Sequence, residues 1–405
     1  MNRRWTQWII LSVGLVLVLT AARSWVRREG DFQLYVGLGE TVLRGGHIYR
    51  DLGEGGNTWP PFYALWCAPV ALAARLGPRV VRTGWVALNL VFLFLIMRML
   101  ARSVYGKALG LVPRRGAFSL ASPEMLLPLL LTAVFLNDDL NYLQVNLVIL
   151  ACVTAGICRL AEGRDAAGGA WLGFAAALKV LPGLFIPYLF WRGRWRAGIA
   201  ATVVAGVCSL SPALVFGWRR FLDFVAAWPQ AAHWGWGMNG PNQSLLAMSE
   251  RFAGQGRWVG AASLPRGYLG ASGDPAVLVV WGLVVAAAVV AMAVVIRPRG
   301  AWNRETALIE CSAVLTASIL LGPLSWYHYF VALVVPLTVL GDALCRRAPW
   351  VLVILACLVF PSSSGLVRYP LSTVWLNLSA VTFAGLLVLA ACLWSRGSSP
   401  SSRGR

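Results

Sequence analysis

One acidic side chain stands where the chain leaves its first apolar segment. Asp31 follows the apolar run of residues 6–24, and after a short polar stretch Trp59-Pro60-Pro61 opens the next apolar segment. An acid placed between two such segments lies at the boundary between water and lipid. A helix-capping or interfacial acid is the plain alternative, because loops often contain one. Asp31 is therefore the first candidate for a catalytic carboxylate.

A lysine inside an apolar run is the second candidate. Lys179 is one of two lysines in an arginine-rich chain, and it lies within the apolar residues 167–192. Burying such a charge costs about 2.5 to 3.5 kcal/mol on membrane-insertion scales, so a functional role is the default interpretation. The alternative is a side chain that extends to the nearer interface.

A histidine and four amides complete the candidates that the residue types suggest. His328 begins an apolar span beside Trp326, where a histidine with satisfied hydrogen bonds is the alternative to a site residue. Side-chain amides both donate and accept hydrogen bonds, as sugar hydroxyls require, although each could also cap a helix. Four of them lie near the ends of apolar runs: Gln144, Asn146, Asn242 and Gln243.

The composition indicates the class of protein that must position these residues. Hydrophobic residues make up 58% of the 405 and charged residues 13%, and the mean hydropathy is +0.68. These values are typical of a polytopic membrane protein rather than a soluble domain. The net charge of +19 comes from arginines at the ends of apolar runs, which favours a role in topology over nucleic-acid binding.

Apolar runs recur along the chain and must be helical in lipid, where no water satisfies the backbone. The run of residues 167–192, broken by Lys179 and Pro182, predicts two short helices in a hairpin. The runs lie near residues 6–24, 59–77, 79–98, 122–137, 141–160, 167–192, 197–217, 276–296, 306–323, 327–344, 349–366 and 371–394.

Arginine clusters set the orientation, because cytoplasmic loops are rich in Arg and Lys. With Asp31 outside, all arginine clusters face the cytoplasm only if the chain crosses the membrane an odd number of times between Asp31 and Arg98. Residues 59–77 contain three prolines and are expected to re-enter or lie in the interface. This assignment places Arg75 and the nearby arginines outside, which counts against it. In the alternative, the runs 59–77 and 79–98 both cross the membrane, and every later loop lies on the opposite side. We expect about twelve crossings.

This topology gathers the unusual polar residues on the outer face of a cell membrane. One integral membrane domain, residues 1–405, would then contain a first outer loop at 31–78, with the interfacial helix, and a large outer loop at 218–275. No internal repeat is visible, which argues against an inverted-repeat transporter.

Seven short motifs in order resemble glycosyltransferase family 87, whose members are membrane enzymes of the GT-C superfamily that use polyprenyl-phosphate sugars. Trp59 stands where a tyrosine is common, and Tyr329 stands where the family often has a second histidine. The motifs are Asp31-Phe32-x-x-Tyr35, Gly45-x-x-Ile48-Tyr49, Trp59-Pro60-Pro61, Leu143-Gln144-Val145-Asn146, Ala177-Leu178-Lys179-Val180-Leu181-Pro182, Asn242-Gln243-Ser244 and Ser325-Trp326-Tyr327-His328.

The resemblance implies that Asp31 is the general base and that His328 orients it or contacts the donor phosphate. A lipid-linked phosphate is the natural partner of the Lys179 ammonium, because a compact cation can neutralise the phosphate as it leaves the sugar. Arg368 is either a second contact to this phosphate or an ordinary interfacial arginine. Monophosphate donors need no metal clamp, so neither a metal at the adjacent acids Asp138 and Asp139 nor another cofactor is expected. The remaining implied substrate-binding residues are Tyr35, Trp59, Gln144, Asn146, Asn242, Gln243 and Trp326.

The implied reaction is transfer of a hexose, with mannose the first candidate, to a hydroxyl of a lipid or glycan, with inversion. A relative that transfers arabinose is one alternative. A lipid-linked-sugar flippase is another, although its polar residues should spread through the spans and not gather on one face.

Overall fold

The computed structural model describes residues 3–53, 56–110, 117–233, 241–253, 275–298, 302–363 and 371–398. Helices account for nearly all of their regular structure, and the described residues contain no strand, only two isolated β-bridges. The prediction of an all-α protein is confirmed. The first nine elements are α1 (Arg3–Arg27), α2 (Phe32–Leu43), α3 (Pro61–Ala74), α4 (Pro78–Tyr105), α5 (Pro123–Asn141), α6 (Asn146–Ala161), α7 (Asp165–Leu178), η1 (Leu181–Leu184) and α8 (Phe185–Trp191).

The second half of the chain is also helical, with two short 3-10 segments. Its elements are α9 (Trp195–Phe216), α10 (Trp218–His233), α11 (Leu245–Ala253), α12 (Pro275–Val295), α13 (Arg304–Leu321), η2 (Tyr327–Leu333), α14 (Val334–Arg347), α15 (Pro349–Val359), η3 (Phe360–Ser362), α16 (Leu371–Asn377) and α17 (Ala380–Ser398).

Six helical segments among the described residues are long and apolar enough to cross a membrane, so the chain is a multi-pass membrane protein. Four shorter apolar helices accompany them. About twelve crossings therefore remains a prediction. The six segments are Trp5–Arg27, Pro78–Tyr105, Trp195–Phe216, Pro275–Val295, Tyr327–Arg347 and Ala380–Ser398.

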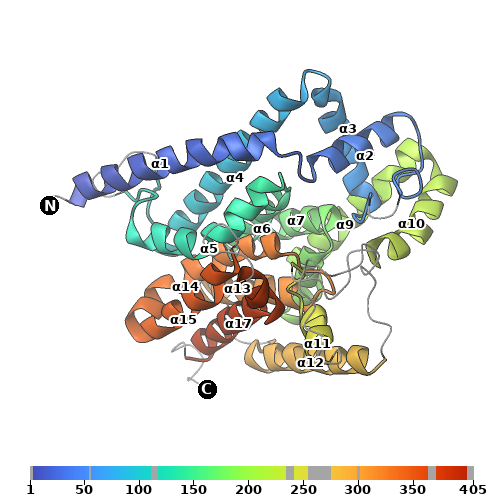
Figure 1. The fold of residues 1–405 in the computed structure, drawn as a ribbon. Helices are drawn as coiled ribbons and strands as arrows, with labels where there is room; N and C mark the ends of the chain where they lie inside the picture. The colour runs from blue at the N-terminus through green and yellow to red at the C-terminus, as the bar shows by residue number, and fades with distance from the viewer. Residues whose placement is uncertain are drawn as a thin grey trace.

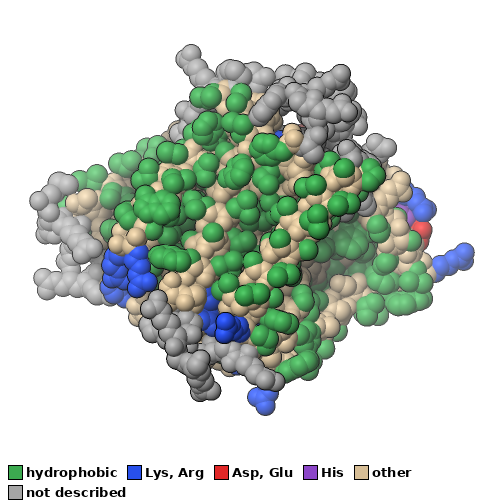
Figure 2. All heavy atoms as spheres, turned by 90° about the horizontal axis from the view of Figure 1, so that it is seen from below, with side chains coloured by type: hydrophobic (Ala, Val, Ile, Leu, Met, Phe, Trp, Pro, Cys, Tyr) green, Lys and Arg blue, Asp and Glu red, His purple; other side chains and the backbone are tan. Residues whose placement is uncertain are grey.

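Helices α6 and α13 lie in the middle of the molecule and α1 and α12 at its edges (Figure 1), and α9 is a third outer helix by the exposure of its side chains. Most residues of α6 and α13 are buried, whereas the three outer helices expose apolar side chains such as Leu17, Val207 and Leu283. Figure 2 shows one face covered mainly by hydrophobic side chains, with Lys and Arg toward its margins. Such a surface suits lipid and is unsuited to water.

Helix α3 occupies most of the proline-rich run 59–77 for which an interfacial or re-entrant position is expected. Its 14 residues extend about 21 Å, less than the roughly 30 Å of a bilayer's hydrocarbon core. Helix α3 packs closely on α2. A Cβ added to Gly39 of α2 would lie only 2.2 Å from the carbonyl oxygen of Cys67 of α3. The length agrees with the expectation, and whether α3 crosses stays a prediction.

Two predicted runs are interrupted in the structure. Residues 167–192 divide at Lys179, whose extended backbone separates α7 from η1 and α8, as the lysine and Pro182 predicted. Residues 371–394, expected as one span, instead form α16 and α17, separated at Ser379, which has a φ of +57°. The length of the run gave no sign of this second break.

A buried ion cluster joins the end of α8 to α13 and α17. Glu310 of α13 is fully buried and accepts hydrogen bonds of 2.7 Å from Arg192 and from Arg396, and one of 3.0 Å from Tyr188. Both arginines follow apolar runs, in clusters that are expected on the cytoplasmic side. Their guanidinium groups hold α13 against α17 and the end of α8, because a buried carboxylate requires charged or hydrogen-bonded partners.

Candidate active site

Asp31 is held by a side chain from a distant turn. Its carboxylate accepts a 2.5 Å hydrogen bond from the side-chain nitrogen of Gln144. The side-chain oxygen of Gln144 accepts a 3.3 Å hydrogen bond from the hydroxyl of Tyr35. Asp31 precedes α2 but makes no side-chain capping bond to it. The helix-capping alternative for Asp31 is therefore wrong.

The turn that carries Gln144 joins α5 to α6 and contacts the Asp31 segment through its backbone. Gly30 has a φ of +49°, and a Cβ there would lie 2.7 Å from the carbonyl oxygen of Tyr142. That same oxygen accepts a 3.0 Å hydrogen bond from the Asp31 amide. Leu143 has a φ of +53°, and its carbonyl accepts 2.8 Å from the indole of Trp85. Only a glycine at position 30 permits this approach.

Tyr35 and Trp59 form the aromatic wall behind Asp31. Both are buried, with ring centroids 5.3 Å apart in an edge-to-face arrangement, and Tyr63 lies 4.9 Å from Trp59. The side chain of Asn57 accepts a hydrogen bond from the Trp59 amide, which fixes the approach to α3. The aromatic cluster keeps water from one side of the carboxylate.

Lys179 lies near the same turn. Its ammonium donates a 2.7 Å hydrogen bond to the side chain of Asn146, the first residue of α6, and lies 3.3 Å from the ring centroid of Tyr329. Asn146 in turn donates 2.8 Å to the carboxylate of Asp139. Lys179 is 8% exposed, so it does not extend to solvent as the snorkelling alternative required.

His328 lies near Asp31 and pairs with a second acid. Its Nδ1 is 3.3 Å from the Asp138 carboxylate, and the ring of Tyr142 packs 5.9 Å from the imidazole. Since a carboxylate only accepts, Nδ1 carries the proton. His328 comes from η2 and Asp138 from α5, so the contact joins the two halves of the site.

Burial dominates the charge state of Asp31. It raises the pKa of that carboxyl above the ordinary value of 3.8, and the charge of Asp138 adds to this. The charge of His328, the Gln144 hydrogen bond and the charge of Lys179 oppose the increase in the pKa. A carboxylate with a raised pKa is a stronger base than an exposed one.

Asn242 and Gln243 form hydrogen bonds with the main chain of neighbouring segments. Asn242 accepts from the Ser325 amide at 3.0 Å and forms an isolated β-bridge with the half-buried Trp326. Gln243 donates 2.8 Å to the carbonyl of Leu376. These contacts fix the segment that leads into η2 and hence the position of His328. Arg368 lies outside the described residues.

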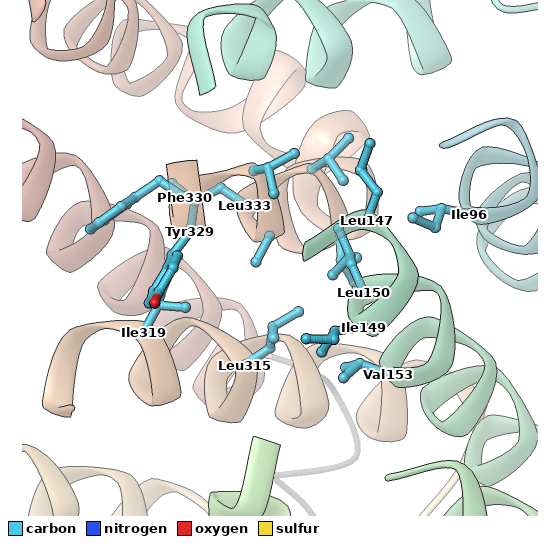
Figure 3. Close-up of a cluster of buried hydrophobic side chains, with 14 of the residues drawn as sticks. Ile96, Leu147, Ile149, Leu150, Val153, Leu315, Ile319, Tyr329, Phe330 and Leu333 are labelled. Atoms are coloured by element: carbon cyan, nitrogen blue, oxygen red, sulfur yellow. The ribbon is translucent and has the colours of Figure 1, made fainter. Parts of the chain in front are cut away.

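Asn146 and Lys179 contribute polar groups to the lining of a narrow, mainly apolar cavity. Side chains of α6, α13 and η2 line it, including Leu150, Leu315 and Tyr329. Figure 3 shows several of these hydrophobic side chains directed toward a common space between the three elements. A cation at one end of an apolar lining could hold a ligand with an anionic head and a hydrocarbon tail.

A comparison with known protein families identifies the family of this chain. The model of glycosyltransferase family 87 matches residues 57–323, more than half of the 405-residue chain. The chain belongs to glycosyltransferase family 87. The match includes Gln144, Asn146 and Lys179 but begins after Asp31 and ends before His328. No curated protein and no solved structure matches this glycosyltransferase.

Two features of the glycosyltransferase escaped the sequence reasoning. Asp138 and Asp139 were considered only as metal ligands, whereas the structure pairs them with His328 and Asn146. An acid inside an apolar helix was the available signal, since it is costly without a partner. Among the described residues there is no group of three or more His, Cys, Asp or Glu side chains that could hold a metal.

The second missed feature is His47, to which the sequence assigned no role. Its Nδ1 accepts from the backbone amides of Tyr49 and Arg50, so Nε2 carries the proton and donates 3.0 Å to Asp223. Arg50 binds the other oxygen of Asp223 at 2.9 Å. The contact attaches the loop before α3 to α10, and nothing in the local sequence indicates it.

Proposed function

We propose that this membrane glycosyltransferase transfers a hexose, with mannose the first candidate, from a polyprenyl phosphate to a hydroxyl of a lipid or glycan on the outer face of the cell membrane. One observation carries the proposal. Asp31 and Lys179, a half-buried carboxylate and a buried cation, are held by Gln144 and Asn146, which are two positions apart in the sequence where α5 joins α6. Transfer from a phosphate needs such a base and such a cation close together.

The reaction proceeds in one inverting step. Asp31 accepts the proton of the acceptor hydroxyl while the hydroxyl oxygen forms a bond to C1 of the sugar. The bond from C1 to the phosphate oxygen breaks, and its electron pair stays on the phosphate. The ammonium of Lys179 stabilises the charge that develops there, and attack from the side opposite the phosphate inverts C1.

The surroundings of Lys179 support a lipid-linked donor over a nucleotide sugar. The cavity at the ammonium is lined mainly by apolar side chains, contributed by α6, η1, α13 and η2. Hydrocarbon contacts of this kind suit the first isoprene units of a prenyl chain but leave the hydroxyls of a nucleotide without partners. A monophosphate also matches the single cation better than a diphosphate does.

Purified protein in lipid nanodiscs tests the proposal. Radiolabelled polyprenyl-phosphate mannose and native membrane lipid should give a labelled, mannosylated lipid with an inverted anomeric centre. Asp31→Asn protein, prepared in parallel, is the matched control and should give almost no product. Transfer from a nucleotide sugar but not from the lipid-linked donor would contradict the proposal. Transfer of arabinose in place of mannose would correct the sugar, and movement of the donor across vesicles without transfer would indicate a flippase.

A further inference from the structure

Asp139 is a fully buried acid one helical turn before the α5–α6 turn, and the proposed chemistry does not use it. Its Oδ1 accepts a 2.8 Å hydrogen bond from Asn146, whose own oxygen accepts 2.7 Å from Lys179. The three side chains thus form a continuous chain of contacts from the core to the ammonium. Its other carboxylate oxygen, Oδ2, is buried without a hydrogen-bond partner in the part of the chain that the structure describes.

Asp139 determines how the amide of Asn146 is oriented. An asparagine amide has an oxygen and a nitrogen of similar shape, and only its partners decide which end points where. A carboxylate only accepts and an ammonium only donates, so the nitrogen must face Asp139 and the oxygen must face Lys179. With the acid removed, this orientation of Asn146 would no longer be imposed.

The contacts of Lys179 fix its ammonium group but do not use all of its hydrogen-bond donors. An ammonium has three protons to donate. Asn146 takes one, and the face of the Tyr329 ring lies 3.3 Å from the nitrogen. Within the described residues no further hydrogen-bond acceptor contacts the ammonium, so a ligand anion has a donor available. The buried negative charge of Asp139 partly offsets the cost of keeping this cation out of water.

The main chain of Asp139 also contacts Gln144, the residue that binds Asp31. Its carbonyl accepts a 2.9 Å hydrogen bond from the backbone amide of Gln144, the residue whose side chain binds Asp31. Asp139 therefore contacts both Gln144, which binds Asp31, and Asn146, which binds Lys179. Burying a carboxylate with one oxygen unpaired is costly for folding, which argues for a role beyond packing.

We infer that Asp139 is a positioning residue for the donor phosphate, which fixes the ammonium of Lys179 through the amide of Asn146. The inference rests on the proposed function, because it assumes that Lys179 binds the donor phosphate.

A double-mutant cycle on the full-length protein in nanodiscs tests it. The donor KM is measured with a short-chain prenyl-phosphate mannose for Asp139→Asn, Lys179→Met and the double variant. Asp139→Asn keeps the size of the side chain and should raise the donor KM about tenfold, the scale of one charge-assisted hydrogen bond, with the acceptor KM unchanged. The double variant should be no worse than Lys179→Met alone, because the acid acts through the lysine.

The outcomes separate this inference from the proposed function. An unchanged donor KM in Lys179→Met would remove the lysine from the phosphate site and with it both claims. A raised KM in Lys179→Met with an unchanged KM in Asp139→Asn, or independent effects in the double variant, would overturn the inference alone. Asp342→Asn, the same substitution at an exposed acid of α14, is the control and should leave the donor KM unchanged.

Asn146→Ser provides a second test if Asp139→Asn does not fold. It breaks the link while keeping both charges, and it should raise the donor KM to a similar degree. Monodisperse elution from a sizing column establishes that each variant is folded. Failure of both variants to fold would assign the contacts a structural role and overturn the inference.

Discussion

The Asp31 carboxylate and the Gln144 amide, 113 residues apart in the sequence, share a hydrogen bond of 2.5 Å. The bond ties the segment after the first helix to the turn between α5 and α6. Because the amide donates to the charged form of the acid, it both orients the carboxylate and favours its ionisation.

Asp31→Asn should reduce turnover by about a hundredfold or more, the usual scale for loss of a general base. Because burial raises the pKa of Asp31, its ionised form is costly to the fold, and the neutral amide should not lower the melting temperature at neutral pH. Initial rates and thermal unfolding check both statements. Glu29→Gln, at an exposed acid two residues away, is the control. A variant that keeps more than about a tenth of the rate would place the base elsewhere.

The rate should fall on the acid side of its pH profile (the acid limb), at a pH determined by the pKa of Asp31. Base catalysis requires the ionised carboxylate, so the rate should fall as the pH is lowered through its pKa. Burial raises that pKa above 3.8, and the limb should therefore lie at a higher pH than for an exposed aspartate. A profile of kcat/KM against pH in nanodiscs measures it. A limb at or below the ordinary carboxyl range would contradict the described environment.

Gln144→Leu should move this limb to still higher pH. The Gln144 hydrogen bond is one of the interactions that lower the pKa of Asp31, so removing it leaves burial less opposed. The plateau rate should also fall, because the carboxylate loses its orientation. The same kcat/KM profile provides the measurement, and an unmoved limb would show that the hydrogen bond does not govern the ionisation.

Gly30→Ala should destabilise the protein and lower its activity. The φ of +49° costs an alanine about 1 to 2 kcal/mol, and the Cβ at 2.7 Å from the Tyr142 carbonyl adds a steric clash. Thermal unfolding and initial rates measure the two effects. Gly14→Ala in α1 is the matched control, because nothing lies within 4 Å of the added Cβ. Equal melting temperatures for the two variants would contradict the tight approach.

Cysteine labelling tests the predicted topology. In a variant without the eight native cysteines, Arg44→Cys should react with an impermeant thiol reagent on intact cells, whereas Ala108→Cys should react only after lysis. Both positions are exposed. Labelling of position 108 from outside would mean an even number of crossings between the two sites and would remove the non-crossing assignment of residues 59–77.

The sequence indicated individual residues better than it indicated their partners. Asp31 and Lys179 attracted notice because a charge beside or inside an apolar run is costly. The break at Lys179 followed from the lysine and Pro182 in the same way. The contact of Lys179 with Asn146, however, joins residues 33 positions apart and depends on how α6 and α7 pack, which local composition does not encode. The polar residues Asn242 and Gln243 could equally have bound sugar or backbone, and only the fold shows their backbone partners.

The close approach of Gly30 to Tyr142 also attaches Asp31 to the protein core and not to the first helix alone. Helix α1 exposes most of its length, while its last turns are attached through Trp25 to Asn137 of α5, and the next residues join the α5–α6 turn. Nearer its N-terminus the helix meets the start of α5, where the side-chain amide of Gln7 lies 3.5 Å from the hydroxyl of Ser122. If a change in bilayer thickness tilts α1, we expect the contacts around Gly30 to keep Asp31 at the depth set by the protein core.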